Sequence, residues 1–266
     1  MKRRLWLWKN RLIPSISMAF IFPLIIILLI IVPFKSIILY SVSGLLYESW
    51  VYPGFIFLIT SIGIFPQLYR DFFDLRIHQK LLANIALTPY SKSTIIYSYL
   101  VCSIIEAIFF GFLAAIIYSL FIPTNLFFLD YLVLLLLVIL HLFLLGNFFI
   151  TMCLTINSIT IMWVAIFCSF IFVTLGNGFV LEFEFFPQIM ELILRSQPFS
   201  YSHQSFYMFS SINIVNWKLI SFTLVIVYFW ILFNGFFLRR KFQQWFFMRV
   251  LSFSISLNAK FIINVL

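Results

Sequence analysis

Two side chains that can carry a charge, Glu106 and His141, lie inside long apolar stretches of the sequence. A charge at the centre of a bilayer costs roughly 2.5–3.5 kcal/mol on insertion scales, so such residues usually face the protein interior, where they can contact a substrate or a proton. Neutral, hydrogen-bonded packing residues would fit the same positions. His141 has no histidine or carboxylate three or four residues away, which argues against a metal site. Both residues are therefore intramembrane polar candidates, with function and packing as open alternatives.

The charged segment 70–92 is the second place where the sequence could support a function. Its charges alternate with apolar residues at helical spacing, which predicts an amphipathic helix. Pro89 would end this helix, because a residue before proline avoids the α conformation. Such a helix between two spans can dock into a groove on a partner protein, or it can rest on the membrane as a solvated loop. The docking candidates are Arg70, Asp71, Asp74, Leu75, Arg76 and Lys80.

The sequence lacks the motifs that would indicate chemistry of its own. No Gly-Lys pair occurs, so a P-loop for ATP is absent, and neither G-x-S-x-G nor H-E-x-x-H is present. The three cysteines form no C-x-x-C pair. We therefore predict no catalytic, cofactor-binding or metal-binding residue, and we expect that the chain is not an enzyme.

The composition indicates a membrane environment. Of the 266 residues, 64% are hydrophobic and 9% are charged, whereas soluble domains have about 45–50% apolar and about 25% charged residues. A soluble fold could not cover so much apolar surface with so few charges. In a bilayer that surface faces lipid and needs no cover. We predict an all-α integral membrane protein without a sizeable soluble domain.

Six apolar runs are long enough to cross a bilayer, which takes about 20 residues. They cover residues 12–34, 50–69, 93–121, 127–154, 159–175 and 217–238. Residues 1–11 mix basic residues with tryptophan, which predicts a helix lying at the membrane surface. The mixed segment between the fifth and sixth runs predicts short outer helices. The chain thus divides into an interfacial helix (1–11), a six-span domain (12–238) and a basic tail (239–266).

The positions of the basic residues predict the orientation. If the six spans alternate in direction, only Lys35, Arg195 and Lys218 of the 17 Lys and Arg residues fall on one side. The other side receives both termini and the segment 70–92. Because basic residues stay in the cytoplasm, both termini are predicted to be cytoplasmic. The net charge of +9 then reflects orientation, and no nucleic-acid partner is expected.

Four motifs occur along these spans in a fixed order. They are Pro53-Gly54 at the second span, Leu87-Thr88-Pro89-Tyr90-Ser91 after the charged segment, Gly178-Phe179 to Phe186-Pro187 after the fifth span, and Gln197-Pro198-Phe199-Ser200-Tyr201 before the sixth. By these motifs and their order, the chain resembles the permease subunits of type-2 ABC exporters over about residues 5–241. It departs from the family pattern at Gln197, where asparagine is usual.

The resemblance implies a transport mechanism. Two permease copies would pair in the membrane, and each would bind a separate ATPase subunit through the segment 70–91 and the surface helix near Trp6. ATP would be bound by that partner, whose movement would open a path for an amphiphilic or polymeric substrate. A non-transporting scaffold, or a lipid-modifying enzyme that uses Glu106 or His141, are the alternatives. The expected location is a bacterial inner membrane or, alternatively, a plastid membrane.

Overall fold

The computed structural model describes residues 12–40, 44, 46–78, 82, 85, 88–124, 126–176, 178 and 181–265, with side chains described within 19–241 and at 243. In these ranges the only β-structure is one isolated bridge between Tyr40 and Leu46. The prediction of an all-helical protein is therefore confirmed for the described residues. The predicted interfacial helix at 1–11 lies outside them.

Six helical stretches in the described ranges are long and apolar enough to cross a membrane. The elements that form them are α2 (Leu12–Ile26), η1 (Ile27–Ile31) and α3 (Val32–Ile37); α4 (Tyr47–Leu68), η2 (Tyr69–Asp74) and α5 (Leu75–Ile77); α7 (Lys92–Phe121); α8 (Phe128–Thr155); α9 (Ile159–Gly176); and α12 (Trp217–Val265). Shorter elements join α9 to α12: η3 (Phe183–Phe185), α10 (Gln188–Ser196), η4 (Pro198–Ser200) and α11 (Tyr201–Ile212). The architecture is that of a helical bundle with six helices that could span a membrane.

One predicted helix boundary is wrong. The second span was expected to end at Tyr69, with a separate amphipathic helix from Arg70, but the helix continues without a break from Tyr47 to Ile77. Phe72 and Phe73 explain the continuation, because both are fully buried and hold η2 against the bundle. The sixth span-capable stretch, Trp217–Lys241, ends close to the predicted 238, and α12 itself continues to Val265.

Both π-helical stretches follow a proline. Pro23 lies inside α2 and precedes η1, and Pro66 lies inside α4 and precedes η2. Proline removes one backbone donor from the helix and clashes with the carbonyl four residues earlier, and a π-turn is one way in which a helix takes up such a disturbance. In each of these two helices the disturbance introduced by the proline is thus followed by a local π-helix.

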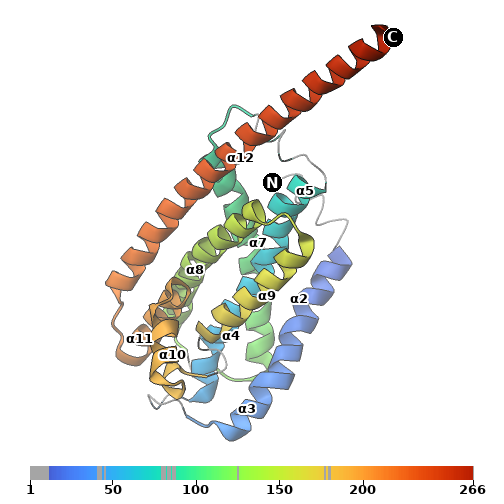
Figure 1. The fold of residues 1–266 in the computed structure, drawn as a ribbon. Helices are drawn as coiled ribbons and strands as arrows, with labels where there is room; N and C mark the ends of the chain where they lie inside the picture. The colour runs from blue at the N-terminus through green and yellow to red at the C-terminus, as the bar shows by residue number, and fades with distance from the viewer. Residues whose placement is uncertain are drawn as a thin grey trace.

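The bundle has α4 and α8 at its centre. Most of α4 and α8 is buried, whereas α2, α9 and α12 bury less than a quarter of their most apolar stretch. Of the surrounding helices, α7 packs on α4, α12 packs on α7 and α8, and α2 packs on α7. Figure 1 shows the long helices side by side, with α5 at one end of the bundle and α3, α10 and α11 at the other.

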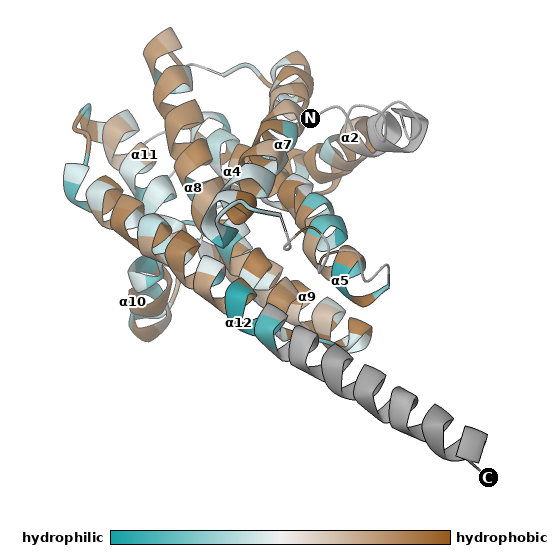
Figure 2. Ribbon diagram, turned by 90° about the horizontal axis from the view of Figure 1, so that it is seen from above, coloured by the Kyte–Doolittle hydropathy of each residue, from teal (hydrophilic) through white to brown (hydrophobic). Residues whose placement is uncertain are grey.

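The distribution of polarity is the reverse of that in a soluble protein. Large apolar side chains are exposed on the outer helices, among them Leu29, Leu120, Phe167 and Phe229, each at least 64% exposed. Polar side chains are instead buried inside, among them Ser61, His141, Asn147 and Asn234. Figure 2 shows the outer helices predominantly in the hydrophobic colour. An apolar exterior around buried, hydrogen-bonded polar groups is what a bilayer selects, and the structure is compatible with a multi-pass membrane protein.

Close helix contacts occur at glycines, and one pair gives a matched test. A Cβ at Gly235 would lie 2.2 Å from Ser93 Oγ and 3.1 Å from its Cα, whereas a Cβ at Gly63 would meet nothing closer than 3.4 Å. We expect Gly235→Ala to destabilise the protein by about 1–3 kcal/mol, because α7 and α12 must separate. Gly63→Ala should be neutral or slightly stabilising. Thermal unfolding of the two purified variants in detergent checks this, and equal shifts would contradict the packing.

Candidate functional site

The predicted docking residues lie where the second long helix leaves the centre of the bundle. Arg70 is partly exposed and contacts Asp71 at 3.4 Å and Gln67 Oε1 at 3.2 Å. Asp74 is also partly exposed, whereas Asp71 and Leu75 are buried. The predicted residue Lys80 lies outside the described residues. Within the described part of this segment, Arg70 and Asp74 are therefore the docking candidates that a partner could reach.

Arg76 has a different place from the other docking candidates. Its side chain is 5% exposed and reaches across to the end of α8. Nη1 donates to Leu154 O at 2.6 Å and Nη2 donates to Ile156 O. The last carbonyls of a helix lack intrahelical partners and carry the negative end of the helix dipole. Arg76 therefore caps α8 and fixes the end of the second helix to it.

His141 is fully buried between α4, α8 and η4. Its Nδ1 lies 3.1 Å from Phe199 O, and its Nε2 lies 3.0 Å from Ser61 Oγ. Because a carbonyl oxygen only accepts, the proton must be on Nδ1, and Nε2 accepts from the hydroxyl. The Ser61 hydroxyl also lies 2.6 Å from Phe57 O, so its one proton has two acceptors. Both ring nitrogens of His141 are thus used in holding three elements together.

Glu106 lies on α7, is half-buried and does not contact the ring nitrogens of His141. The structure therefore does not bring the two intramembrane candidates into one site. Within the described residues, a cluster of polar side chains inside the bundle instead joins α8 to α12. Asn234 Nδ2 donates to Asn147 O at 3.0 Å, Thr151 Oγ1 donates to Asn234 Oδ1 at 2.8 Å, and Trp230 Nε1 donates to Thr151 Oγ1 at 2.9 Å. These bonds hold α12 to the bundle.

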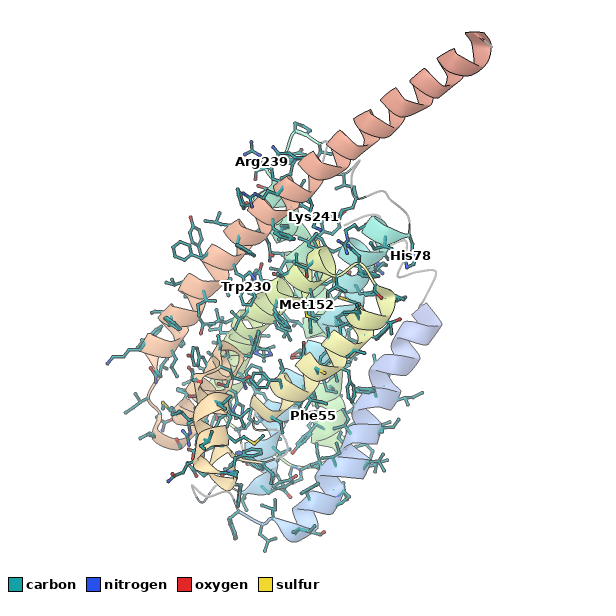
Figure 3. All side chains as sticks on the ribbon, viewed as in Figure 1. Phe55, His78, Met152, Trp230, Arg239 and Lys241 are labelled. Atoms are coloured by element: carbon teal, nitrogen blue, oxygen red, sulfur yellow. The ribbon has the colours of Figure 1, made fainter. Side chains whose placement is uncertain are left out.

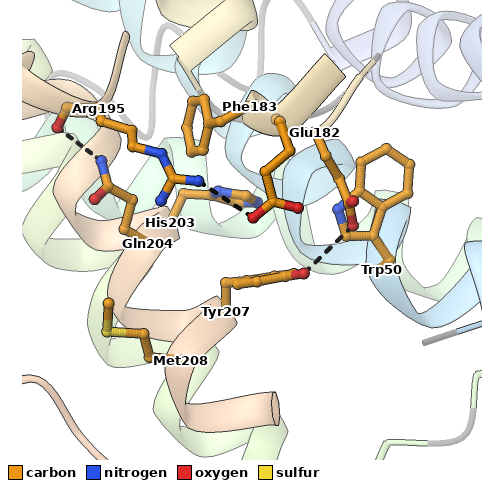
Figure 4. Close-up of a pocket in the computed structure, with 10 residues that line it drawn as sticks. Trp50, Glu182, Phe183, Arg195, His203, Gln204, Tyr207 and Met208 are labelled. Carbon is orange, nitrogen blue, oxygen red and sulfur yellow. Dashed lines mark hydrogen bonds and ion pairs between the residues drawn. The ribbon is translucent and has the colours of Figure 1, made fainter. Parts of the chain in front are cut away.

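A pocket lies at the end of the bundle where α10 and α11 fold back between the long helices (Figure 4). The break after α9 supplies Gly178, and Glu182 to Glu184 follow around η3. α10 supplies Arg195, and α11 supplies His203, Gln204, Tyr207 and Met208. From α4, Trp50 closes the inner side and is 3% exposed. The pocket thus has aromatic walls and several charged or polar groups.

The charges in the pocket are arranged around Arg195. Its Nε donates to Glu191 Oε1 at 2.7 Å, its Nη2 donates to Glu184 Oε1 at 3.3 Å, and its guanidinium lies 5.5 Å from the centre of the Phe183 ring. Glu182 is 5% exposed and accepts a hydrogen bond from the Tyr207 hydroxyl at 3.5 Å. Two carboxyl groups, those of Glu182 and Glu184, and one guanidinium thus line the pocket, so acidic groups outnumber basic ones there.

His203 is the buried polar group of this pocket. It is 4% exposed, and its Nδ1 is buried without a hydrogen-bond partner. Gly178 adopts a φ of +57°, and a Cβ there would lie 2.8 Å from His203 Cε1, so glycine allows both the turn and the ring contact. Burial and, to a lesser degree, the nearby His141 lower the pKa of His203 to about 4. The imidazole is therefore neutral at pH 7.

Sequence reasoning placed most of the pocket residues in the segment of short outer helices between the fifth and sixth runs and placed Trp50 at the start of the second run. It did not identify them as a site. The available signal was the density of polar residues between two glycines and the sixth span. Comparison of the chain with family models, curated proteins and solved structures finds no match.

Proposed function

We propose that the chain is the membrane-spanning permease subunit of an ATP-driven ABC exporter and works with a separate ATPase subunit. The observation that carries the proposal is the bundle itself: six span-capable helices with an apolar exterior and polar contacts inside. The chain has no P-loop, so in ATP-driven transport the ATP would be bound by a partner subunit. The motif resemblance to type-2 exporter permeases supports the same conclusion. Two copies would form the translocation path together.

The charge distribution supports an orientation for this permease. The end of the bundle with α5 carries Arg70, Arg76, Lys92, Arg239, Arg240 and Lys241 against two described aspartates. Figure 3 shows His78, Arg239 and Lys241 at this end. The end with α10 and α11 carries five acidic residues against Lys35, Arg195 and Lys218. On the positive-inside rule the α5 end is cytoplasmic, where an ATPase would be.

The ATPase contact is proposed at the exposed part of the α5 end. Arg70 and Asp74 can reach a partner, and they stand on a helix that runs without a break into the centre of the bundle. A push on this end would therefore be passed along the continuous helix into α4. Because α4 packs against both α7 and α8, the movement would be passed to the helices that line a path between two copies.

A charge reversal at Arg70 tests the proposed contact. We expect Arg70→Glu to reduce the ATPase retained on the purified chain roughly tenfold, because a like charge at a charged interface costs on the order of 1–2 kcal/mol or more. Lys218→Glu, at the opposite end of the bundle, is the matched control and should retain the ATPase fully. The measurement is quantitative immunoblotting of the ATPase after purification. Equal retention in both variants would remove Arg70 from the contact.

A further inference from the structure

We propose that the pocket between α10, α11 and η3 binds an alkylammonium group that carries at least one N–H. The inference is independent of the proposed transport function, because it concerns binding to the chain itself. It rests on three features: a buried acceptor, an excess of acidic groups and aromatic walls.

The buried acceptor belongs to His203, which lines the pocket and whose Nδ1 is buried without a hydrogen-bond partner. A buried polar atom left without a partner costs roughly 1–3 kcal/mol. The neutral imidazole, in the tautomer with its proton on Nε2, offers Nδ1 as an acceptor. A ligand N–H would satisfy it. The Phe57 and Phe183 rings form T-shaped contacts with the His203 ring at centroid distances of 6.0 and 6.2 Å, which fixes its plane.

The charges favour a cation over an anion. The one guanidinium of the pocket, that of Arg195, already bonds two carboxyl groups, Glu184 and Glu191. An anion would have to compete with both of them. Glu182, which accepts from the Tyr207 hydroxyl, adds a second carboxyl group to the lining beside Trp50. Aromatic faces attract cations within about 6 Å, so these walls suit the same ligand.

The size of the pocket limits the ligand to a head group. The cavity volume is about 40 Å³, whereas one water molecule needs roughly 10–15 Å³ on the same measure. An ammonium with one or two carbons fits, but a drug-sized molecule does not. The outer face of the neighbouring helix α10 is apolar and exposed at Ile189 and Leu192, at 78% and 72%. Such an amphipathic helix lies well at a membrane surface, where an alkyl tail would leave the pocket.

The test uses the purified full chain in nanodiscs of neutral lipid, with empty nanodiscs as blank. The probes are butylammonium, butyltrimethylammonium and octylammonium, and binding is followed by saturation-transfer NMR titration. We expect butylammonium or octylammonium to bind, and butyltrimethylammonium, which has no N–H, to bind at least fivefold more weakly than butylammonium. If octylammonium binds at least tenfold more tightly than butylammonium, the natural ligand is the head group of an amphiphile. If the two bind equally, the natural ligand is a small free amine.

Two variants assign the binding to this pocket. Glu182→Gln keeps the shape and removes the charge, and His203→Phe keeps a flat ring and removes the acceptor. Each should weaken binding at least fivefold, whereas Glu48→Gln, which loses only its ion pair with Lys35 outside the pocket, should bind as the original chain. Thermal unfolding identifies a variant that fails to fold, in which case the other variant decides. Absence of binding by every amine, or equal binding by all variants, would overturn the proposal.

Discussion

Replacing Arg76 with methionine is expected to lower the free energy of unfolding by about 2–3 kcal/mol. The two bonds from its guanidinium to Leu154 O and Ile156 O join the second long helix to the end of α8, and hydrogen bonds to charged groups contribute roughly 1.5–3 kcal/mol. Methionine would fill much of the same space but would leave the carbonyls without these donors. Thermal unfolding of the purified variant in detergent measures the effect.

Arg70→Met is the matched control for this prediction. Arg70 is six residues away on the same stretch, but its bonds go only to Gln67 and Asp71 of its own helix, and exposed pairs of this kind contribute about 0–1 kcal/mol. Its variant should therefore unfold close to the original temperature. If the two variants unfolded alike, Arg76 would not be the cap of α8, and its prediction as a docking residue would regain weight.

Removal of the His141 ring has the second large expected effect. His141→Ala should cost about 2–5 kcal/mol, because it leaves a cavity at a fully buried position and frees Ser61 and Phe199 O from their partner. The ring also contacts Phe57 edge to face at 5.1 Å. The measurement is again thermal unfolding. A double variant, described next, separates the contribution of the hydrogen bond to stability from that of the cavity.

A double-mutant cycle with Ser61→Ala isolates the hydrogen bond. If the Ser61 hydroxyl donates to His141 Nε2, the two single changes should be non-additive by about 0.5–3 kcal/mol. The matched serine control is Ser103→Ala on α7, because that hydroxyl is buried but donates to Tyr99 O within its own helix. Its cycle with His141→Ala should be additive. A coupling of zero in the Ser61 cycle would contradict the assigned bond.

The apolar runs predicted the spans well because lipid imposes a simple requirement on them. The third, fourth and fifth runs agree with α7, α8 and α9 to within one residue at each end. At these ends the sequence changes from apolar to turn-forming, as at Pro123 and at Asn157-Ser158. Where the change in composition falls at the end of a helix, the sequence alone predicts that end.

The end of the second long helix was predicted too early, because this part of the helix is rich in charged residues. Residues 70–77 are rich in charge, so they were expected to leave the bundle, but Phe72 and Phe73 are buried and keep the helix packed. The pocket could not be predicted from the sequence for a different reason. Trp50 is far from Glu182 and His203 in the sequence, and only the folding back of α10 and α11 brings them together. The role of Arg76 likewise depends on its contact with Leu154, which lies 78 residues later in the sequence.

The most direct test of the proposed permease function is purification of the tagged chain from its native membranes in mild detergent. We expect a stoichiometric second protein that carries a P-loop, identified and quantified by mass spectrometry, and we expect the purified complex to hydrolyse ATP. Recovery of the folded chain without any P-loop protein, or of a complex that does not hydrolyse ATP, would contradict the proposal.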